Sequence, residues 1–298
     1  MQNDFALYNG VKIPPVGMGT WPLRGDNLEY LMAQAIDLGY RMFDTADNYF
    51  NEEFVGNVVS KIKREDLFIV TKLSDEKKIG FPFSSIGKYF YKNSSYMKEH
   101  TAKETVNVIF ENSLKKLKTD YVDLLIMHWP YPDYFLEIWS AMENLVKDGK
   151  VRAIGISNCR ERHFELLKKN GLSKPMVHQV SISPLDTKKE LFNYCNSNDI
   201  CQICYAPLMC ARNSKFAESS IAKQLANKYG VGLSGLILLW NKSQGLIPIP
   251  KSTKTERLKE NFDIVMNDFK MDAADIEALS SLNINMQYLP ESCYCPGL

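Results

Sequence analysis

The chain has 298 residues, of which 45% are hydrophobic, so it can bury a large core, and its length is common among single-domain α/β barrels. Acidic and basic residues are interspersed and the formal net charge is +1, which argues against a nucleic acid or a membrane surface as the main partner. The polar N-terminus lacks a signal-peptide core, and the uncharged stretches are too short to span a bilayer. These features predict a soluble, cytoplasmic protein.

The first element expected is an N-terminal β-hairpin within residues 1–15. Phe5–Tyr8 and Val11–Ile13 flank the pair Asn9 and Gly10, which is a strong signal for a two-residue hairpin turn. Because this hairpin precedes the main strands, we expect it to cap the bottom, N-terminal mouth of a barrel.

After the hairpin, strand-like and helix-like segments alternate, which is typical of βα units around a parallel sheet. The predicted strands are Val16–Met18, Arg41–Phe43, Leu67–Lys72, Val122–His128, Val151–Ser157, Met176–Ser181, Cys201–Tyr205 and Leu246–Pro250. Amphipathic helices are expected at Leu28–Leu38, Lys103–Leu117, Tyr134–Lys147, Arg160–Lys169, Lys188–Asn198, Ala217–Tyr229 and Leu233–Asn241. Eight such strands predict a single (β/α)8 TIM barrel over residues 1–298, with its active site at the C-terminal rim.

Two segments are longer than a minimal barrel requires. Residues 74–102 form an extended loop rich in aromatic, serine and lysine residues, and residues 283–298 form a C-terminal tail without periodicity. Loops of this length are usually functional or mobile. We expect both segments to reach the rim.

Four ionisable residues lie at or just beyond the ends of successive predicted strands: Asp44, Tyr49, Lys72 and His128. Counting back in twos places apolar residues such as Met42 on the same strand face as these polar groups. A charged side chain among barrel residues needs partners to offset its desolvation. The placement therefore predicts one built site at the rim.

The chemistry of these groups suits carbonyl reduction. A nearby ammonium group favours the phenolate form of a tyrosine, and Lys72 could be that neighbour with Asp44 as its counter-charge. His128 could orient a substrate oxygen or share proton transfer. Tyr49 would then donate a proton to oxygen while a nicotinamide cofactor supplies hydride to carbon.

The residues taken singly leave other interpretations open. Asp44 could be a turn residue, Tyr49 and His128 could be packing residues, and Lys72 could form a Schiff base if its pKa were depressed. Cys201 and Cys204 form a CxxC, but their odd spacing places them on opposite strand faces, and the seven cysteines fit reduced thiols. The histidines share no metal-ligand spacing, so no metal site is expected.

A basic segment follows the last predicted strand and leads toward a helix. Barrels often bind phosphate after strands seven and eight, where backbone amides and the helix dipole favour anions. Two cations and two hydroxyls lie there, namely Lys251, Ser252, Thr253 and Arg257. The segment can also be read as a solvated basic surface.

Several motifs in order resemble those of the aldo-keto reductase family over nearly the whole chain. The catalytic motifs are DTADNY (Asp44 to Tyr49), Thr71-Lys72 and HWP (His128 to Pro130). The accompanying motifs are GMGTW (Gly17–Trp21), GKVRAIGISN (Gly149–Asn158), YAPL (Tyr205–Leu208) and IPKSTKTERLKEN (Ile249–Asn261). Each motif alone is weak, but the series is specific.

The resemblance implies a TIM-barrel reductase of an aldehyde or ketone. It makes Tyr49 the general acid, Lys72 and Asp44 its tuning pair, and His128 the residue that orients the substrate. Trp21 and Trp129 match residues that wall the substrate pocket. The implied partner is a small-molecule carbonyl, and the protein is expected to be a monomer or weak homodimer.

The resemblance also implies NADPH as cofactor. Ser157, Asn158 and Gln179 would bind the carboxamide, and Tyr205 would stack on the nicotinamide. Lys251 and Arg257 would hold the 2′-phosphate, because an arginine fork suits phosphate. The remaining implied cofactor contacts are Gly19, Thr20, Pro207, Leu208, Ser252, Thr253, Glu260 and Asn261.

Two departures from the family pattern bear on substrate and partner. The segment 74–102 is longer than usual, and Ser181 stands where an acidic residue is common. The first leaves the substrate class open. It also leaves an alternative function, a cofactor-binding regulatory barrel that acts through a protein partner.

Overall fold

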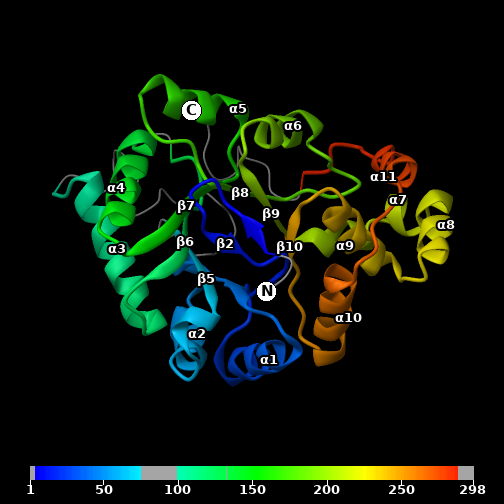
Figure 1. Cartoon of the computed structure of the whole chain (residues 1–298), viewed down its shortest axis with the longest axis horizontal. Helices are drawn as coiled ribbons and strands as arrows, with labels where there is room; N and C mark the ends of the chain where they lie inside the picture. Colours follow the sequence, from blue (N-terminus) through cyan, green and yellow to red (C-terminus); the bar gives the residue numbers. More distant parts are fainter. Residues whose placement is uncertain (1–3, 75–98, 132, 288–298) are drawn as a thin grey trace.

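A barrel of eight parallel strands forms the centre of the computed structural model, which describes residues 4–74, 99–131 and 133–287. The strands follow sequence order around the barrel, and helices surround them (Figure 1). Their bounds are β3 Gly17–Gly19, β4 Met42–Asp44, β5 Phe68–Leu73, β6 Val122–Met127, β7 Val151–Ser157, β8 Val177–Val180, β9 Cys201–Tyr205 and β10 Ile247–Ile249. The predicted (β/α)8 fold is confirmed, and every predicted strand overlaps an observed one.

Side chains alternate between the inside and the outside of the barrel. Met42, Val70 and Ile126 belong to the interior cluster, together with residues from β7 to β10. The intervening residues Phe43, Ile69 and Leu125 belong to the cluster between strands and helices. The period of two predicted for these strands is therefore present, and it directs the polar residue at each strand end toward the barrel axis.

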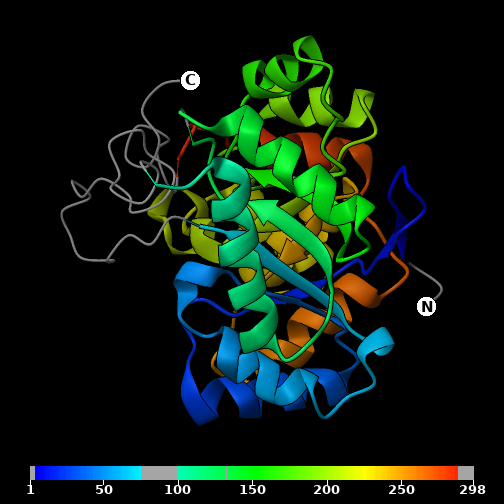
Figure 2. The ribbon, with the colours of Figure 1, turned by 90° about the vertical axis from the view of Figure 1, so that its left-hand side faces the viewer.

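The N-terminal hairpin closes one mouth of this interior. β1 (Phe5–Ala6) pairs antiparallel with β2 (Lys12–Ile13), so the predicted hairpin is present with shorter strands. Leu7 and Ile13 are buried in the same cluster as the interior side chains of the barrel. Figure 2 shows the hairpin, in dark blue, at one end of the barrel.

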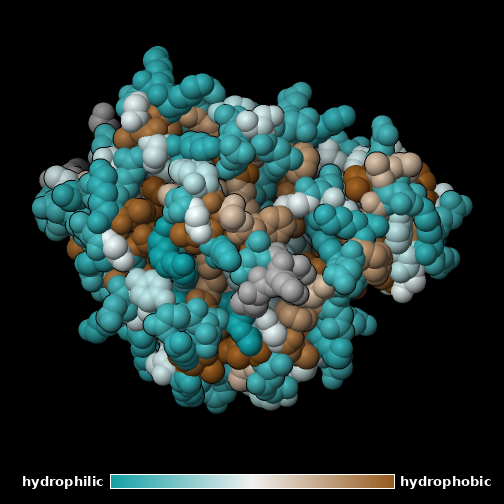
Figure 3. Space-filling view, viewed as in Figure 1, coloured by the Kyte–Doolittle hydropathy of each residue, from teal (hydrophilic) through white to brown (hydrophobic). Residues whose placement is uncertain are grey.

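Helices cover the outside of the barrel. They are α1 Gly25–Leu38, α2 Glu52–Val59, α3 Ala102–Leu117, α4 Phe135–Lys147, α5 Glu161–Lys169, α6 Lys189–Ser197, α7 Ser214–Ala217, α8 Ser220–Lys228, α9 Leu233–Ser243, α10 Thr255–Met266 and α11 Ala273–Ser280. On the face shown in Figure 3, hydrophilic side chains dominate the periphery. Within the described residues, no helix is long and apolar enough to cross a membrane.

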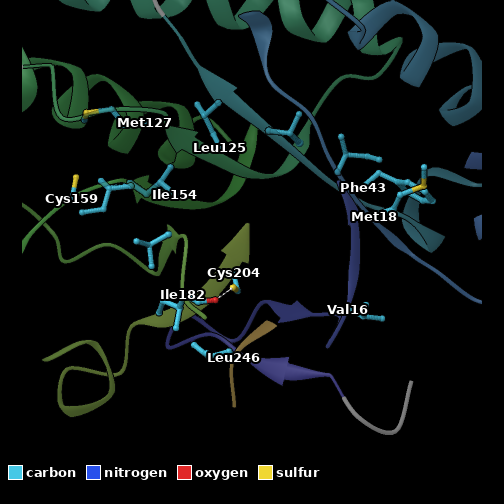
Figure 4. Close-up of a cluster of buried hydrophobic side chains, with 14 of the residues drawn as sticks. Val16, Met18, Phe43, Leu125, Met127, Ile154, Cys159, Ile182, Cys204 and Leu246 are labelled. Carbon is cyan, nitrogen blue, oxygen red and sulfur yellow. Dashed lines mark hydrogen bonds between the residues drawn. The ribbon is translucent and has the colours of Figure 1, made fainter. Parts of the chain in front are cut away.

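The two cysteines of the CxxC lie on opposite faces of β9, as predicted. Cys201 packs against the interior cluster, whereas Cys204 lies in the outer cluster and donates to the carbonyl of Ile182 at 2.9 Å (Figure 4). Burial raises the pKa of both thiols to about 12. Because the two thiols point to opposite faces of the strand, they do not face each other as a disulfide or a shared metal site requires.

Glycines allow the first and last strands to meet. The amide of Gly19 on β3 donates to the carbonyl of Pro250, just after β10, at 3.2 Å. A Cβ atom on Gly19 would lie 2.9 Å from the carbonyl oxygen of Ile249. Glycine is therefore required sterically at this seam, which closes the barrel beside the basic segment.

The two long segments are described only in part. The extended loop predicted at residues 74–102 lies mostly outside the described residues, as does the end of the tail predicted at 283–298. In the described part of the tail, the amides of Ile284 and Met286 donate to the carbonyl of Leu185, each at 3.0 Å. The tail therefore begins by crossing the loop after β8.

Candidate active site

Successive strands deliver the predicted site residues to one rim. Asp44 ends β4, Lys72 lies near the end of β5, and His128 directly follows β6. In register, Asp44 pairs with Val70 and Lys72 pairs with Ile126. Tyr49 belongs to the short 3-10 helix η1 (Asp47–Tyr49) that follows β4. The structure therefore brings together the four residues that sequence analysis grouped.

Lys72 is the centre of the site. Its ammonium nitrogen lies 2.6 Å from Oδ1 of Asp44, 2.8 Å from the carbonyl oxygen of Thr45 and 3.3 Å from the hydroxyl of Tyr49. An ammonium group has three donors, and three oxygen atoms surround this one. The hydroxyl oxygen of Tyr49 accepts from Lys72, so this contact does not use the proton of that hydroxyl.

The buried ion pair governs the charge of Lys72. Its side chain is fully buried, and burial lowers its pKa, while Asp44 and, more weakly, Glu52 oppose the shift. Both nearest acceptors of Lys72 favour the charged form. We therefore assign an ammonium–carboxylate pair beneath the hydroxyl of Tyr49, which disfavours a Schiff-base role for Lys72.

Gln179 on β8 holds the other side of Asp44. Its amide nitrogen donates to Oδ2 of Asp44 at 2.7 Å, so both carboxylate oxygens of Asp44 are hydrogen-bonded. The sequence predicted a cofactor contact for Gln179 and did not predict this second bond. The bond fixes the direction in which Asp44 presents Oδ1 to Lys72.

His128 is buried and neutral. Burial lowers its pKa well below its usual range, and the charge of Lys72 lowers it further. Its ring meets the ring of Tyr49 edge-on, with centroids 5.7 Å apart. The hydroxyl of Ser74 lies 2.6 Å from Nδ1 of His128. A neutral histidine beside a tyrosine hydroxyl can donate a hydrogen bond to a substrate oxygen.

Asn158 connects the ends of β6, β7 and β9. Its amide nitrogen donates to the carbonyl of His128 at 3.1 Å and to the hydroxyl of Ser157 at 3.0 Å. Its amide oxygen accepts from the hydroxyl of Tyr205 at 2.8 Å. Three of the predicted cofactor residues thus form one network with the backbone of His128.

A cavity of about 30 Å³ lies beside this network. Trp129, Asn158 and Tyr205 line it together with Ser181, where the family pattern differs, and Gln287 of the described tail. The tail therefore reaches the rim, as expected. Trp21 does not line this cavity, and its side chain is 44% exposed.

The basic segment lies beyond the closing seam of the barrel. Lys251, Thr253 and Arg257 are exposed, whereas the hydroxyl of buried Ser252 accepts from the amide of Lys254 at 3.0 Å. No side chain caps the N-terminus of α10. Its first amides therefore remain available to an anion.

The other predicted cofactor residues lie around this seam and the rim. Thr20 is fully buried and donates to the carbonyl of Asp44 at 2.9 Å. Pro207 and Leu208 begin the 3-10 helix η4 (Pro207–Arg212) after β9. On α10, Glu260 is exposed and Asn261 is buried.

A buried acid that was not predicted from the sequence lies behind the site. Glu52 on α2 is 1% exposed and accepts from the hydroxyl of Thr71 at 2.6 Å. Thr71 adjoins Lys72, so this carboxylate lies behind the strand that carries the ammonium group. In the sequence, Glu52 follows DTADNYFN directly and precedes the apolar residues of α2, where an acid is too common to mark a buried site.

Metal chemistry finds no support in the described part of the chain. Residues 4–74, 99–131 and 133–287 contain no group of three or more His, Cys, Asp or Glu side chains that could hold a metal ion.

Comparisons with known proteins agree with this geometry. The model of the aldo/keto reductase family matches residues 15–284. Glyoxal reductase of Bacillus subtilis is 36% identical over 286 residues, covering 95% of this chain and 94% of the relative. Methylglyoxal reductase DkgA of Escherichia coli O157:H7 is 30% identical over 290 residues, covering 96% of this chain and 95% of the relative.

A solved structure is similar over the same extent. The Bombyx mori aldo-keto reductase, determined in complex with NADP, superposes with a TM-score of 0.81 at 28% identity, covering 99% of this chain and 98% of that one. The predicted family and enzyme class are confirmed: this chain belongs to the aldo/keto reductase family of oxidoreductases.

Proposed function

We propose that this chain reduces an aldehyde or ketone to the alcohol with NADPH, and that Tyr49 is the general acid. The observation that carries the proposal is the distance of 3.3 Å between Nζ of Lys72 and the hydroxyl of Tyr49. The same Nζ lies 2.6 Å from Oδ1 of Asp44. A buried cation at this distance stabilises the phenolate that forms when Tyr49 releases its proton.

The roles of the residues follow from this arrangement. Bound NADPH supplies the hydride that adds to the carbonyl carbon. Tyr49 transfers its hydroxyl proton to the carbonyl oxygen, and Lys72 and Asp44 compensate the charge left on Tyr49. Neutral His128 donates a hydrogen bond to the same oxygen and so orients the substrate.

The residues available for NADPH fit its chemistry. Arg257 and Lys251 offer cations for the 2′-phosphate next to the uncapped amides of α10. At the barrel centre, Ser157, Asn158 and Gln179 offer polar groups for the carboxamide, and Tyr205 offers a ring for stacking. The same proposal includes the contacts predicted for Gly19, Thr20, Pro207, Leu208, Ser252, Thr253, Glu260 and Asn261.

Small dicarbonyl compounds are the first substrates to test. The relatives described above are named as reductases of glyoxal and methylglyoxal. Trp21 and Trp129 are proposed to wall the substrate site, where planar apolar surfaces suit a small planar carbonyl. Oligomeric state and cellular location stay predictions.

Replacing Tyr49 by Phe tests the function. Turnover in an NADPH oxidation assay with methylglyoxal should fall by about 10²- to 10⁴-fold, the usual contribution of a general acid. The dissociation constant for NADPH, measured by fluorescence titration, should change less than about threefold because the ring remains. Undiminished turnover would remove Tyr49 from this role.

Replacing Arg257 by Ala tests the cofactor. The affinity for NADPH should fall by at least about tenfold and that for NADH by less than about twofold, because only NADPH carries the 2′-phosphate. Lys259→Ala is the matched control, since Lys259 lies on the same helix and pairs with Asp263. Equal losses for both cofactors would contradict the assignment.

A further inference from the structure

Ser74 lies next to the candidate active site. Neither the sequence pattern nor the family resemblance predicted a role for it. It is the first residue after β5, and its side chain is fully buried. Its hydroxyl oxygen lies 2.6 Å from Nδ1 of His128, a short hydrogen-bond distance. The contact therefore involves Nδ1 and leaves the other ring nitrogen, Nε2, for a different partner.

Backbone register brings Ser74 to His128. Leu73 on β5 pairs with Met127 on β6, and the amide of His128 donates to the carbonyl of Leu73 at 3.1 Å. The pairing of these two strands therefore continues one residue past β6 and places Ser74 beside His128. The pairing of the two strands therefore sets the position of Ser74.

Neutral His128 can adopt either of two tautomers, and the hydrogen bonds available to Ser74 favour one of them. A neutral imidazole carries its proton either on Nδ1 or on Nε2, and the serine hydroxyl could accept from the first form or donate to the second. If Nδ1–H donated to Ser74, the proton of the buried hydroxyl would have no acceptor among the described residues. Leaving a buried hydrogen-bond donor without an acceptor destabilises the folded protein by about 1 to 3 kcal/mol.

We propose that Ser74 is a positioning residue that donates its hydroxyl proton to Nδ1 and thereby holds His128 in the Nε2–H tautomer. Nε2–H then faces the site as a donor to the carbonyl oxygen that Tyr49 protonates. This inference rests on the proposed function for its catalytic consequence, but the tautomer itself is a property of the protein alone. No net proton transfer to or from His128 is required.

The backbone of His128 is held independently of Ser74. Its amide is bonded to Leu73, and its carbonyl accepts from Asn158 at 3.1 Å. Removing the hydroxyl of Ser74 should therefore release the choice of tautomer while leaving the backbone of His128 in place. This separation allows a variant to test positioning without dismantling the site.

Nitrogen NMR of histidine-labelled protein reads the tautomer directly. The chain has four histidines, and loss of one spin system in His128→Asn assigns the resonances of His128. In the wild type, Nε2 should have the shift of a protonated ring nitrogen and Nδ1 that of an acceptor. In Ser74→Ala, the two shifts should move toward each other as both tautomers become populated. A wild-type ring protonated on Nδ1, or shifts unchanged in Ser74→Ala, would overturn the proposal.

Kinetics provide the second readout. Ser74→Ala should lower kcat for methylglyoxal by about tenfold, with the NADPH dissociation constant unchanged, because an interaction that orients the transition state is lost. Ser74→Thr keeps the hydroxyl and should restore most of the rate. Ser74→Cys, which keeps the volume nearly unchanged with a weaker donor, should lie between alanine and wild type.

The two proposals fail in different ways. An active wild type whose kcat is unaffected by Ser74→Ala would overturn the role of Ser74 and leave the reductase function intact. An inactive wild type with His128 in the Nε2–H tautomer would remove the reductase function and leave Ser74 as the residue that sets the tautomer.

Discussion

Lys116 joins two buried acids on either side of the turn that carries Tyr49. Its nitrogen lies 3.0 Å from Asp47, in the same 3-10 helix as Tyr49, and 3.6 Å from Glu52. Burial raises the pKa of Glu52, and the charge of Asp47 raises it further. Lys116 therefore stabilises the charged form of two carboxylates that would otherwise repel each other.

Replacing Lys116 by Met should destabilise the protein by about 1 kcal/mol at neutral pH, since its side chain is 42% exposed and water screens its pairs. Chemical denaturation measures the loss. Lys115→Met is the control, because Lys115 is exposed on the same helix. A loss as large in the control would show that the ion pairs contribute nothing specific.

His178 makes stability depend on pH. It is fully buried, its Nε2 accepts from the amide of Cys159 at 3.3 Å, and burial lowers its pKa to about 3. Because its pKa is lower in the folded than in the unfolded chain, the unfolded state binds the extra proton. The contribution of His178 to the free energy of unfolding is fully present above about pH 6.5 and is lost progressively as the pH falls toward 3.

Between pH 7 and pH 5, wild type should lose about 2 kcal/mol more of its free energy of unfolding than His178→Gln. Glutamine does not titrate and retains an acceptor for the amide of Cys159. Denaturant titrations of both proteins at the two pH values provide the comparison. Parallel losses would assign the acid sensitivity to other groups.

At the residue scale, the sequence predicted the four ionisable residues that cluster at the rim better than it predicted the residues that contact them. Asp44, Lys72 and His128 were predicted because ionisable residues at the ends of apolar runs are unusual. Ser74 and Glu52 gave no such signal, because a serine after a strand and an acid at a helix start are common. Their significance depends on distances between strands, which a single sequence does not contain.

Among the elements, the N-terminal hairpin is a structural plug far from the chemistry. Ile13 on β2 is fully buried among the interior side chains of the barrel. Ile13→Ala should lower the free energy of unfolding by about 2 to 4 kcal/mol through lost burial and a cavity. Turnover at a temperature where the variant remains folded should change less than about twofold.

Lys12→Ala on the same strand serves as the control for this prediction, because Lys12 is exposed. Its stability should stay within about 0.5 kcal/mol of wild type. A variant of Ile13 with normal stability, or with greatly reduced turnover, would show that the hairpin does not act as an independent plug.

Several strands and long helices were predicted closely, and the short helices were not. The strands β7 and β9 were predicted with their observed bounds, and the predicted Lys103–Leu117 differs from α3 by one residue at its start. The helices α2 and α11 were not predicted. Each has only eight residues, so its short apolar pattern is a weak signal of helix.

At the scale of the whole molecule, we expect the seam between β3 and β10 to couple barrel closure to the proposed cofactor site. In Gly19→Ala, the added methyl group would lie 2.9 Å from the carbonyl oxygen of Ile249, so β10 must shift. The basic segment begins directly after β10. We expect a loss of about 1 to 3 kcal/mol in stability together with weaker NADPH binding.

Differential scanning calorimetry and NADPH titration test this coupling. Gly232→Ala is the matched control, because the methyl group that it adds would have no other atom within 4 Å, and the φ of −73° at Gly232 suits alanine. Reduced stability with unchanged NADPH affinity in Gly19→Ala would show that the seam closes the barrel without shaping the cofactor site.

The apolar lower half of the barrel interior affects which parts of the protein tolerate substitution during evolution. Met42 and Phe68 belong to the same interior cluster as Leu7 and Ile13 of the hairpin, and Asp44 and Lys72 form their ion pair at the upper rim. Substitutions in the rim loops therefore leave the packing that holds the chain folded largely untouched. We expect libraries of exchanged rim loops to yield many folded variants with altered substrate range, whereas equally many changes in the lower half would yield few.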